Sequence, residues 1–182
     1  FGLEIKTVLT IGSQPIGNGI GPVLEMIDVL RVLKRENPPL DLEEKSIFLA
    51  GQILEVTGKA KKGEGKILAK KVLDSGKAYE KFDEIISAQG KTNMKLEPAE
   101  FKHNIRAEKN SKVALIKNRE INLLARILGC PTSASSGIYL YKHCDDSVKK
   151  GELILTMYSD SEQKLKEGIE YYSTEKPIQL ED

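Results

Sequence analysis

The chain has 182 residues, enough for one ordinary domain or two small ones with a buried core. Its 28 basic and 27 acidic side chains are interspersed and give a formal net charge of +1, without the basic stripe of a nucleic-acid-binding protein. No apolar run reaches the roughly 18 residues of a membrane span, so we expect neither a nucleic acid nor a membrane as partner. Cys130 and Cys144 lack a metal-ligand spacing and indicate reduced thiols in a cytoplasmic protein.

The first segment, residues 2–11, alternates polar and apolar side chains before it becomes fully apolar, which predicts a β-strand buried toward its end. The next stretch, TIGSQPIGNGIGPVLE (residues 10–25), holds four glycines and leads to Pro22, which fits the first turn of a helix. Apolar residues then recur at helical spacing until Asn37-Pro38-Pro39 ends the helix.

Three further helices are predicted before the middle of the chain. Asp41 and Glu44 have the spacing of a capping box and predict a helix that ends near Gly58. KILAKKVLDSG and AYEKFDEIISAQG predict two shorter helices, each ending at a glycine. A single strand cannot form a sheet, so the partners of the first strand lie in the second half or in chain outside this sequence. We interpret residues 1–97 as one unit, with the polar residues 91–103 as a linker.

The second half predicts a compact α+β domain over residues 98–182. IRAEKNSKVALIK indicates two strands paired around Lys109-Asn110, and REINLLARILGC indicates a short amphipathic helix. GIYLYKHC and ELILTMYS predict strands joined by the turn DDSVKKG, SEQKLKEGIEYY predicts a helix, and PIQL predicts a last strand.

The glycine run matches neither nucleotide-binding fingerprint. Gly17, Gly19 and Gly21 are spaced G-x-G-x-G and not G-x-G-x-x-G, and no G-x-x-x-x-G-K-[ST] occurs. Two interpretations remain open. The loop is a structural turn, or its carbonyl groups point inward and bind a cation, with Asp28 on the following helix as the acid.

Other polar groups give weaker signals. His143 to Asp146 (HCDD) has the composition of a metal site, but neighbouring side chains on a strand point to opposite faces, which favours a polar turn. His103 is isolated, and the serines at 133–136 lack an accompanying base. KAKKGEGK (59–66) indicates a solvated connection. VKKGELILTMYS resembles the hairpins of biotinyl and lipoyl carriers but lacks their protruding lysine, which disfavours a carrier function.

TIGSQPIGNGIGPVLEMIDVLRVL resembles the pyrimidine nucleoside and thymidine phosphorylase family, which has a similar [NS]-Q-P-[IL]-G-x-x-x-G-x-x-x-E segment in its central α/β domain. The likeness continues through LAGQILEVTGKA and AKKVLDSGKAYEKFDEIISAQGK. LARILGCPTSASSGIYLYKHCDDSVKKGELILTMYSDSEQKLKEG is similar to the C-terminal domain of the archaeal branch, which includes AMP phosphorylases. The resemblance implies an α/β fold, the rear part of the central domain with one strand plus helices, followed by a small α+β domain of hammerhead or barrel-sandwich type.

The activity that the resemblance implies is pentosyl transfer: AMP and phosphate give adenine and ribose 1,5-bisphosphate, with thymidine or pyrimidine nucleoside phosphorolysis as an alternative. The family's phosphate loop and its base-recognition residues lie upstream of this segment, and the chain opens on Phe1 without a methionine. We therefore expect the C-terminal part of a longer enzyme, with no catalytic or substrate-binding residue of its own and no activity alone. A non-enzymatic interaction or carrier-like module is the alternative of another class.

The resemblance also implies an ion. Bacterial members of the family hold potassium beside the phosphate loop through two backbone carbonyls and a carboxylate of this segment. Carried over, the ligands are the carbonyls of Ile16 and Gly19 and the side chain of Asp28, where the family usually has glutamate. No other cofactor is implied. The partners implied are phosphate and a nucleotide or nucleoside, in a cytoplasmic homo-oligomer.

Overall fold

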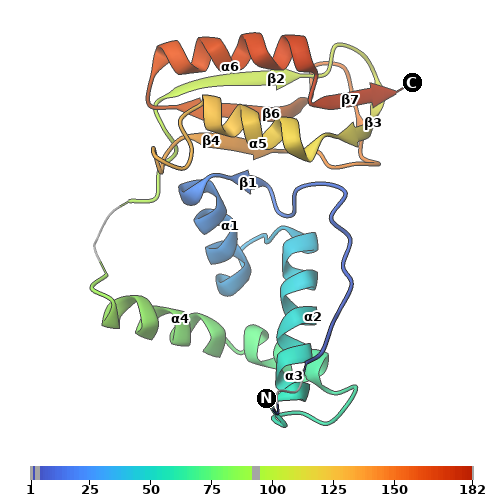
Figure 1. The fold of residues 1–182 in the computed structure, drawn as a ribbon, viewed down its shortest axis with the longest axis vertical. Coiled ribbons are helices and arrows are strands. Elements are labelled where there is room, and N and C mark those ends of the chain that lie inside the picture. The colour runs from blue at the N-terminus through green and yellow to red at the C-terminus, as the bar shows by residue number, and fades with distance from the viewer. Residues whose placement is uncertain (1, 3–4, 92–94, 182) are drawn as a thin grey trace. The chain divides into compact units, whose positions relative to one another are not determined.

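The computed structural model describes residues 2, 5–91 and 95–181, which divide into two compact units (Figure 1). One unit consists of Phe1–Ile11 and Val29–Met94, and the other of Gly12–Asp28 and Lys95–Asp182. This division differs from the predicted one, 1–97 and 98–182, because residues 12–28 pack with the second unit. No helix in the described part of the chain is long and apolar enough to cross a membrane.

Unit 1 is helical, as predicted. Helix α1 (Pro22–Lys34) begins in the second unit and ends in the first, which continues with α2 (Leu40–Val56), α3 (Gly65–Asp74) and α4 (Lys77–Ala88). The small core of this unit is formed by Val32, Ile47, Ala69 and Leu73. Helices α2 and α3 meet at two glycines, because a Cβ on Gly65 would lie 2.1 Å from the carbonyl oxygen of Gly51.

The predicted strand at residues 2–11 is wrong over its described part, residue 2 and residues 5–11, which has no regular structure. Ile5, Leu9 and Ile11 are 82%, 94% and 84% exposed, instead of buried. A strand needs a neighbour whose backbone groups pair with its own, and no strand in the described part of the chain pairs with this segment. Residues 3 and 4 of the predicted strand lie outside the described residues.

The predicted capping box of α2 is also wrong. The helix begins at Leu40, with Pro39 at the N-cap and no side-chain cap. Asp41 therefore lies in the first helical turn, where its charge is favourable next to the unpaired N–H groups at the helix start.

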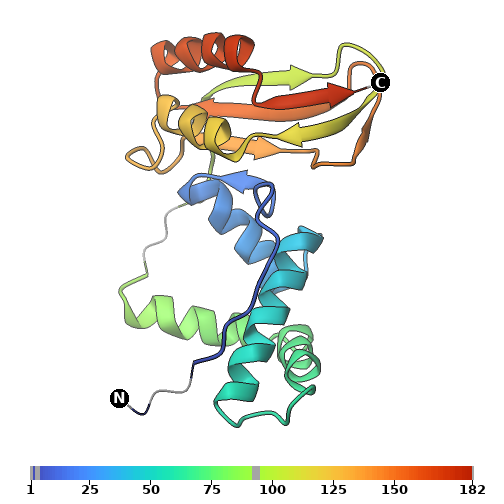
Figure 2. The ribbon, with the colours of Figure 1, turned by 45° about the vertical axis from the view of Figure 1, so that its right-hand side comes forward.

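Unit 2 is an α+β domain of two antiparallel sheets with two helices, α5 and α6, besides the start of α1 (Figures 1 and 2). Sheet A has the order β1-β4-β6-β2 and sheet B the order β5-β3-β7. The strands are β1 (Gly19–Ile20), β2 (Phe101–Arg106), β3 (Ser111–Ile116), β4 (Gly137–Leu140), β5 (Ser147–Val148), β6 (Leu153–Ser159) and β7 (Ile178–Glu181). The helices, both predicted, are α5 (Asn118–Ile127) and α6 (Glu162–Glu175).

The core of unit 2 is formed by residues of both sheets and of the two helices. Alternate residues of β4 and β6 point into it, among them Leu140 and Leu155, which face each other in register and are 0% exposed. Leu124 and Leu128 of the α5 segment and Leu165 of α6 cover them. The α+β prediction for the second half is confirmed in this respect.

One predicted strand pairing is wrong. β2 and β3 flank Lys109-Asn110 as expected, but they belong to different sheets: β2 pairs with β6, and β3 pairs with β5 and β7. Residues 107–110 therefore connect the two sheets, and Ala107 donates its N–H to the carbonyl oxygen of Glu152. His103, predicted to lie in the linker, is part of β2.

Candidate functional site

The glycine loop attaches to the edge of sheet A. β1 pairs with β4 through Gly19 opposite Tyr139 and Ile20 opposite Ile138. Asn18 extends this ladder, since its carbonyl accepts the N–H of Leu140 and its side-chain amide donates to the carbonyl of Leu140, both at 2.7 Å. The loop therefore contributes a strand to unit 2, a role that no periodic pattern in its sequence indicated.

Asp28, the acid proposed for an ion site, is turned toward this loop. Its side chain is buried, with the residue 1% exposed, and its Oδ2 accepts the backbone N–H groups of Asn18 at 2.6 Å and Gly19 at 2.7 Å. A buried carboxylate is costly unless such donors replace water, and charge-assisted hydrogen bonds are the strong ones. Asp28 thus fixes the loop onto the helix that follows it.

The glycines permit close approach. A Cβ on Gly19 would lie 2.4 Å from the backbone carbonyl carbon of Leu24, so any side chain would collide with the first turns of α1. Gly21 has φ +120°, and a Cβ there would lie 2.5 Å from the carbonyl oxygen of Ser136. Both positions therefore need glycine for packing. This is what the interpretation of the loop as a structural turn requires.

Of the three residues predicted to bind an ion, the structure brings together Asp28 and Gly19. It is the N–H of Gly19 that faces the carboxylate. Ile16 is 37% exposed. Within the described residues, no group of three or more His, Cys, Asp and Glu side chains could hold a metal ion. The ion site therefore stays a prediction.

The predicted polar turn at His143 to Asp146 contacts the glycine loop. His143 Nε2 lies 2.8 Å from the carbonyl oxygen of Gly17, and because that oxygen can only accept, Nε2 carries the proton. The backbone N–H of Cys144 donates to Gln14 Oε1 at 2.7 Å, and that of His143 donates to Asp146 Oδ2 at 2.8 Å. These residues hold the loop in place and do not converge as ligands.

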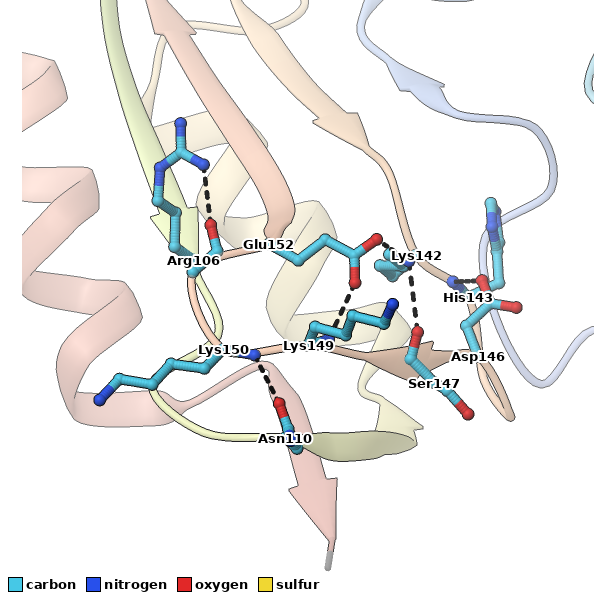
Figure 3. A network of polar contacts seen from close by, with 10 residues as sticks. Arg106, Asn110, Lys142, His143, Asp146, Ser147, Lys149, Lys150 and Glu152 are labelled. Atoms are coloured by element: carbon cyan, nitrogen blue, oxygen red, sulfur yellow. Dashed lines mark hydrogen bonds and ion pairs between the residues drawn. The ribbon is translucent and has the colours of Figure 1, made fainter.

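The turn that follows is held by Glu152 (Figure 3). Lys142 Nζ donates to Glu152 Oε1 at 2.7 Å, and the N–H of Lys149 donates to Oε2 at 2.8 Å. The bond from Lys142 lowers the pKa of Glu152. Lys150 donates its N–H to Asn110 Oδ1 at 2.9 Å, so the turn is tied at both ends. Lys142 thus contacts the turn through its side chain, whereas Lys149 and Lys150 contribute their backbone N–H groups and expose their side chains.

Unit 1 presents an open apolar hollow of about 450 Å³. All four of its helices contribute side chains, including Leu33 of α1, Ile53 of α2, Val72 of α3 and Ala78 of α4. Ile53 is 63% exposed, and Leu49 and Val56 on the same helix are each 37% exposed. An exposed apolar surface of this kind is typical of a face that packs against other protein.

These observations define a class: an α+β protein with a helical unit, a two-sheet C-terminal domain and a glycine loop built into the edge of one sheet. Residues 112–179 match the model of the pyrimidine nucleoside phosphorylase C-terminal domain. The chain is 46% identical over 166 residues to a putative thymidine phosphorylase of Legionella pneumophila (strain Corby), with 91% of this chain and 32% of that protein covered.

The chain is also similar to two archaeal proteins over its whole length. It is 40% identical over 185 residues to the AMP phosphorylase of Methanococcus aeolicus and 38% identical over 186 residues to that of Pyrococcus furiosus, with 100% of this chain and 37% of each relative covered. The chain belongs to the pyrimidine nucleoside phosphorylase family, which includes the AMP phosphorylases. It spans about a third of the length of these relatives. Since bacterial and archaeal proteins both match, the likeness is not confined to the archaeal branch.

Proposed function

We propose that this chain is the C-terminal part of a phosphorylase that converts AMP and phosphate into adenine and ribose 1,5-bisphosphate. The observation that carries the proposal is the coverage of this entire chain by two proteins named AMP phosphorylase. In this reaction an oxygen of phosphate attacks C1′ as the bond to the base breaks, through an oxocarbenium-like transition state. Positioning and electrostatic stabilisation by the longer enzyme supply the catalysis.

The chain's own residues contribute rigidity to such an enzyme. The carboxylate of Asp28 and the imidazole of His143 hold the glycine loop at two points, Gly19 N–H and Gly17 C=O. A loop fixed in this way keeps its backbone groups in a constant arrangement, which a precise active site requires of its supporting elements. We expect the C-terminal domain to act as a scaffold, and not to contact the substrate.

A potassium ion at the glycine loop is part of this proposal. Asp28 already satisfies two backbone donors, so an ion would share the carboxylate with them, together with the carbonyls of Ile16 and Gly19. The test uses full-length enzyme in potassium, sodium and choline chloride at equal ionic strength. Potassium dependence that is lost in Asp28→Asn supports the ion, whereas activity that depends on neither potassium nor Asp28 removes it.

The apolar hollow of unit 1 is, in this proposal, covered by the rest of a longer polypeptide. The support is the exposure of Ile53 beside the hollow and the fact that the relatives are about three times as long as this chain. The fluorescence of an apolar dye distinguishes the cases: the 182-residue chain binds it, and the full-length protein binds it much less. Equal dye binding by both would contradict the covering.

The activity test compares the full reading frame with the 182-residue chain. Each is incubated with phosphate and either AMP or thymidine, and released base is separated by chromatography. We expect adenine from AMP with the full-length protein and no base from the chain alone. The thymidine alternative is favoured by the 46% identity to the Legionella protein, and thymine release without adenine release would establish it.

The mass of the natural product separates an enzyme from an independent module. The chain has a mass of 20.2 kDa, and scaling it by the 37% coverage of the AMP phosphorylases gives about 55 kDa for a full-length enzyme. A natural product of about 20 kDa would favour the non-enzymatic interaction module. A carrier domain would instead show a mass increment on one lysine.

A further inference from the structure

Positive charge is concentrated at one place in unit 1. Residues 59–71 (KAKKGEGKILAKK) hold six lysines and one glutamate, a net charge of +5, so the rest of the chain, with a total of +1, carries −4. We call Lys59, Lys61, Lys62, Lys66, Lys70 and Lys71 the lysine patch; all six are exposed. Three of these lysines lie in the loop between α2 and α3, and the other three lie on α3.

Most of these charges have no counter-ion among the residues that the structure describes. Lys70 pairs with Asp74, with Nζ and Oδ2 2.6 Å apart. The other five lysines of the patch form no ion pair with any carboxylate in the part of the chain that the structure describes. Unpaired like charges in one place repel each other, and an anionic partner relieves that repulsion.

Glu55 holds the backbone of the loop that carries part of the patch. Its Oε1 accepts the N–H groups of Gly63 at 3.0 Å and Gly65 at 3.2 Å, and its Oε2 pairs with Lys6 at 3.3 Å. The carboxylate is therefore engaged with the loop backbone and with another lysine, and does not neutralise the patch. A loop that is already ordered loses less conformational entropy when it binds a partner.

The chemistry of the patch decides between anionic partners. Residues 57–76 contain no aromatic side chain, so bases of a single strand have nothing to stack on. Ile67, 71% exposed, is the large apolar side chain that the patch offers, while Ala69 and Leu73 are buried in the unit's core. A membrane-binding helix or a protein interface needs a larger apolar contact than this.

A shallow hollow of about 740 Å³ on α3 is lined by Lys66, Lys70 and Lys71, and also by Asp74, the partner of Lys70. Ammonium groups on flexible stems act as point charges toward phosphates and need no base contacts. From this charge distribution we propose that the lysine patch binds the phosphate backbone of double-stranded nucleic acid without reading its sequence. The near-zero net charge conceals this surface, because the compensating acidic residues lie in other parts of the chain.

The test is binding of a fluorescent duplex of about 20 base pairs to the 182-residue chain, at salt concentrations from about 50 to about 200 mM. The variant Lys61→Gln/Lys62→Gln/Lys66→Gln removes three charges from the patch. The control Lys102→Gln/Lys149→Gln/Lys150→Gln removes three exposed charges from unit 2. Circular dichroism melting verifies that both variants fold.

Each lost phosphate contact lowers the slope of log K against log salt by about 0.9. In the patch variant we expect the magnitude of this slope to fall by about 2 to 3 and the affinity at the lowest salt to fall at least about tenfold. In the control variant we expect the affinity to change less than about twofold. Absence of duplex binding, or equal losses in both variants, overturns the proposal. The proposal is also overturned if poly-glutamate or phosphatidylserine vesicles bind as tightly as the duplex and lose binding in the same variant. The partner would then be an acidic protein or a membrane.

Discussion

At the scale of single residues, Asp28 shows how a buried charge serves the fold. Its Oδ2 accepts two backbone N–H groups, at 2.6 and 2.7 Å, within a residue that is 1% exposed. In the sequence, Asp28 is an acidic residue inside a predicted helix, and the side chain of such a residue is usually exposed to solvent. What distinguishes it is the approach of Asn18 and Gly19, ten and nine residues earlier, which only the folded loop provides.

Replacing Asp28 by alanine should leave both N–H groups without an acceptor. We expect the free energy of unfolding to fall by about 3 kcal/mol, because each unsatisfied buried donor costs about 1–3 kcal/mol. Urea denaturation measures the change. Glu44→Ala, at an exposed position of α2, is the control and should change stability by less than about 0.5 kcal/mol. Equal effects of the two substitutions would contradict the role of Asp28.

Gly21 and Gly58 form a matched pair for testing the close approach. Both have positive φ, +120° and +69°, but an added Cβ meets the Ser136 carbonyl oxygen at 2.5 Å at Gly21 and nothing within 4 Å at Gly58. We expect Gly21→Ala to cost about 2–4 kcal/mol and Gly58→Ala about 1 kcal/mol, since only the first adds a backbone collision to the strain. Thermal melting distinguishes the two, and a similar cost at both sites would mean that the loop relaxes freely.

Tyr172 makes the stability of unit 2 depend on pH in the alkaline range. Burial raises the pKa of its phenol to about 12, above the value near 10 expected in the unfolded chain. The neutral phenol therefore stabilises the fold fully below pH 10, and this contribution, at most about 2.7 kcal/mol, is lost as pH rises from 10 to 12. Tyr172→Phe should flatten that part of the stability curve measured by urea denaturation. An unchanged curve would show that the phenol does not titrate in this range.

At the scale of elements, residues 5–11 show that a segment with a strand-like sequence does not form a strand without a pairing partner. The segment has the apolar pattern of a strand, yet Leu9 and Ile11 are 94% and 84% exposed and no described strand pairs with them. By contrast, the two residues of β1 form a strand from glycine and isoleucine because β4 offers its edge. A strand exists where a partner edge is available, whatever its own sequence prefers.

This difference predicts a small effect of polar substitutions in the first segment. Leu9→Ser/Ile11→Ser should change the free energy of unfolding of the 182-residue chain by less than about 0.5 kcal/mol, because both side chains are already in water. Urea denaturation measures it. In the longer enzyme that we propose, the same substitutions should cost several times more, and an equal small effect there would contradict burial of this segment in the complete fold.

At the scale of the whole chain, the two units differ in how completely they bury their apolar side chains. The core of unit 2 contains Val113, Leu124, Leu128, Ile138 and Leu155, all 0% exposed. Among the described residues, the core of unit 1 consists of Val32, Ile47, Ala69 and Leu73, each 6–8% exposed, beside an open apolar hollow. Unit 2 therefore has the features of a self-contained domain. Unit 1 has an exposed apolar surface of the kind that packs against further protein.

The sequence by itself determined the elements whose signals are local. Helices α1 to α6 follow from apolar spacing and from proline and glycine punctuation, and β6 and β7 from apolar runs between turns. The family likeness rests on the same local stretches, which is why it was recognisable without coordinates. The Asp41 capping box failed, although it too is a local signal, because the helix begins after Pro39, two residues earlier than the capping box predicted.

Only the tertiary structure decided what each element pairs with. The sequence paired β2 with β3 because they are neighbours, whereas the fold places them in different sheets with β6 and β7. It could not show that Asp28 faces the N–H of Gly19, or that His143 reaches the carbonyl of Gly17 across 126 positions. Hydrogen bonds depend on distance in space, and a sequence pattern encodes periodicity and turn chemistry but not which distant segment supplies the partner.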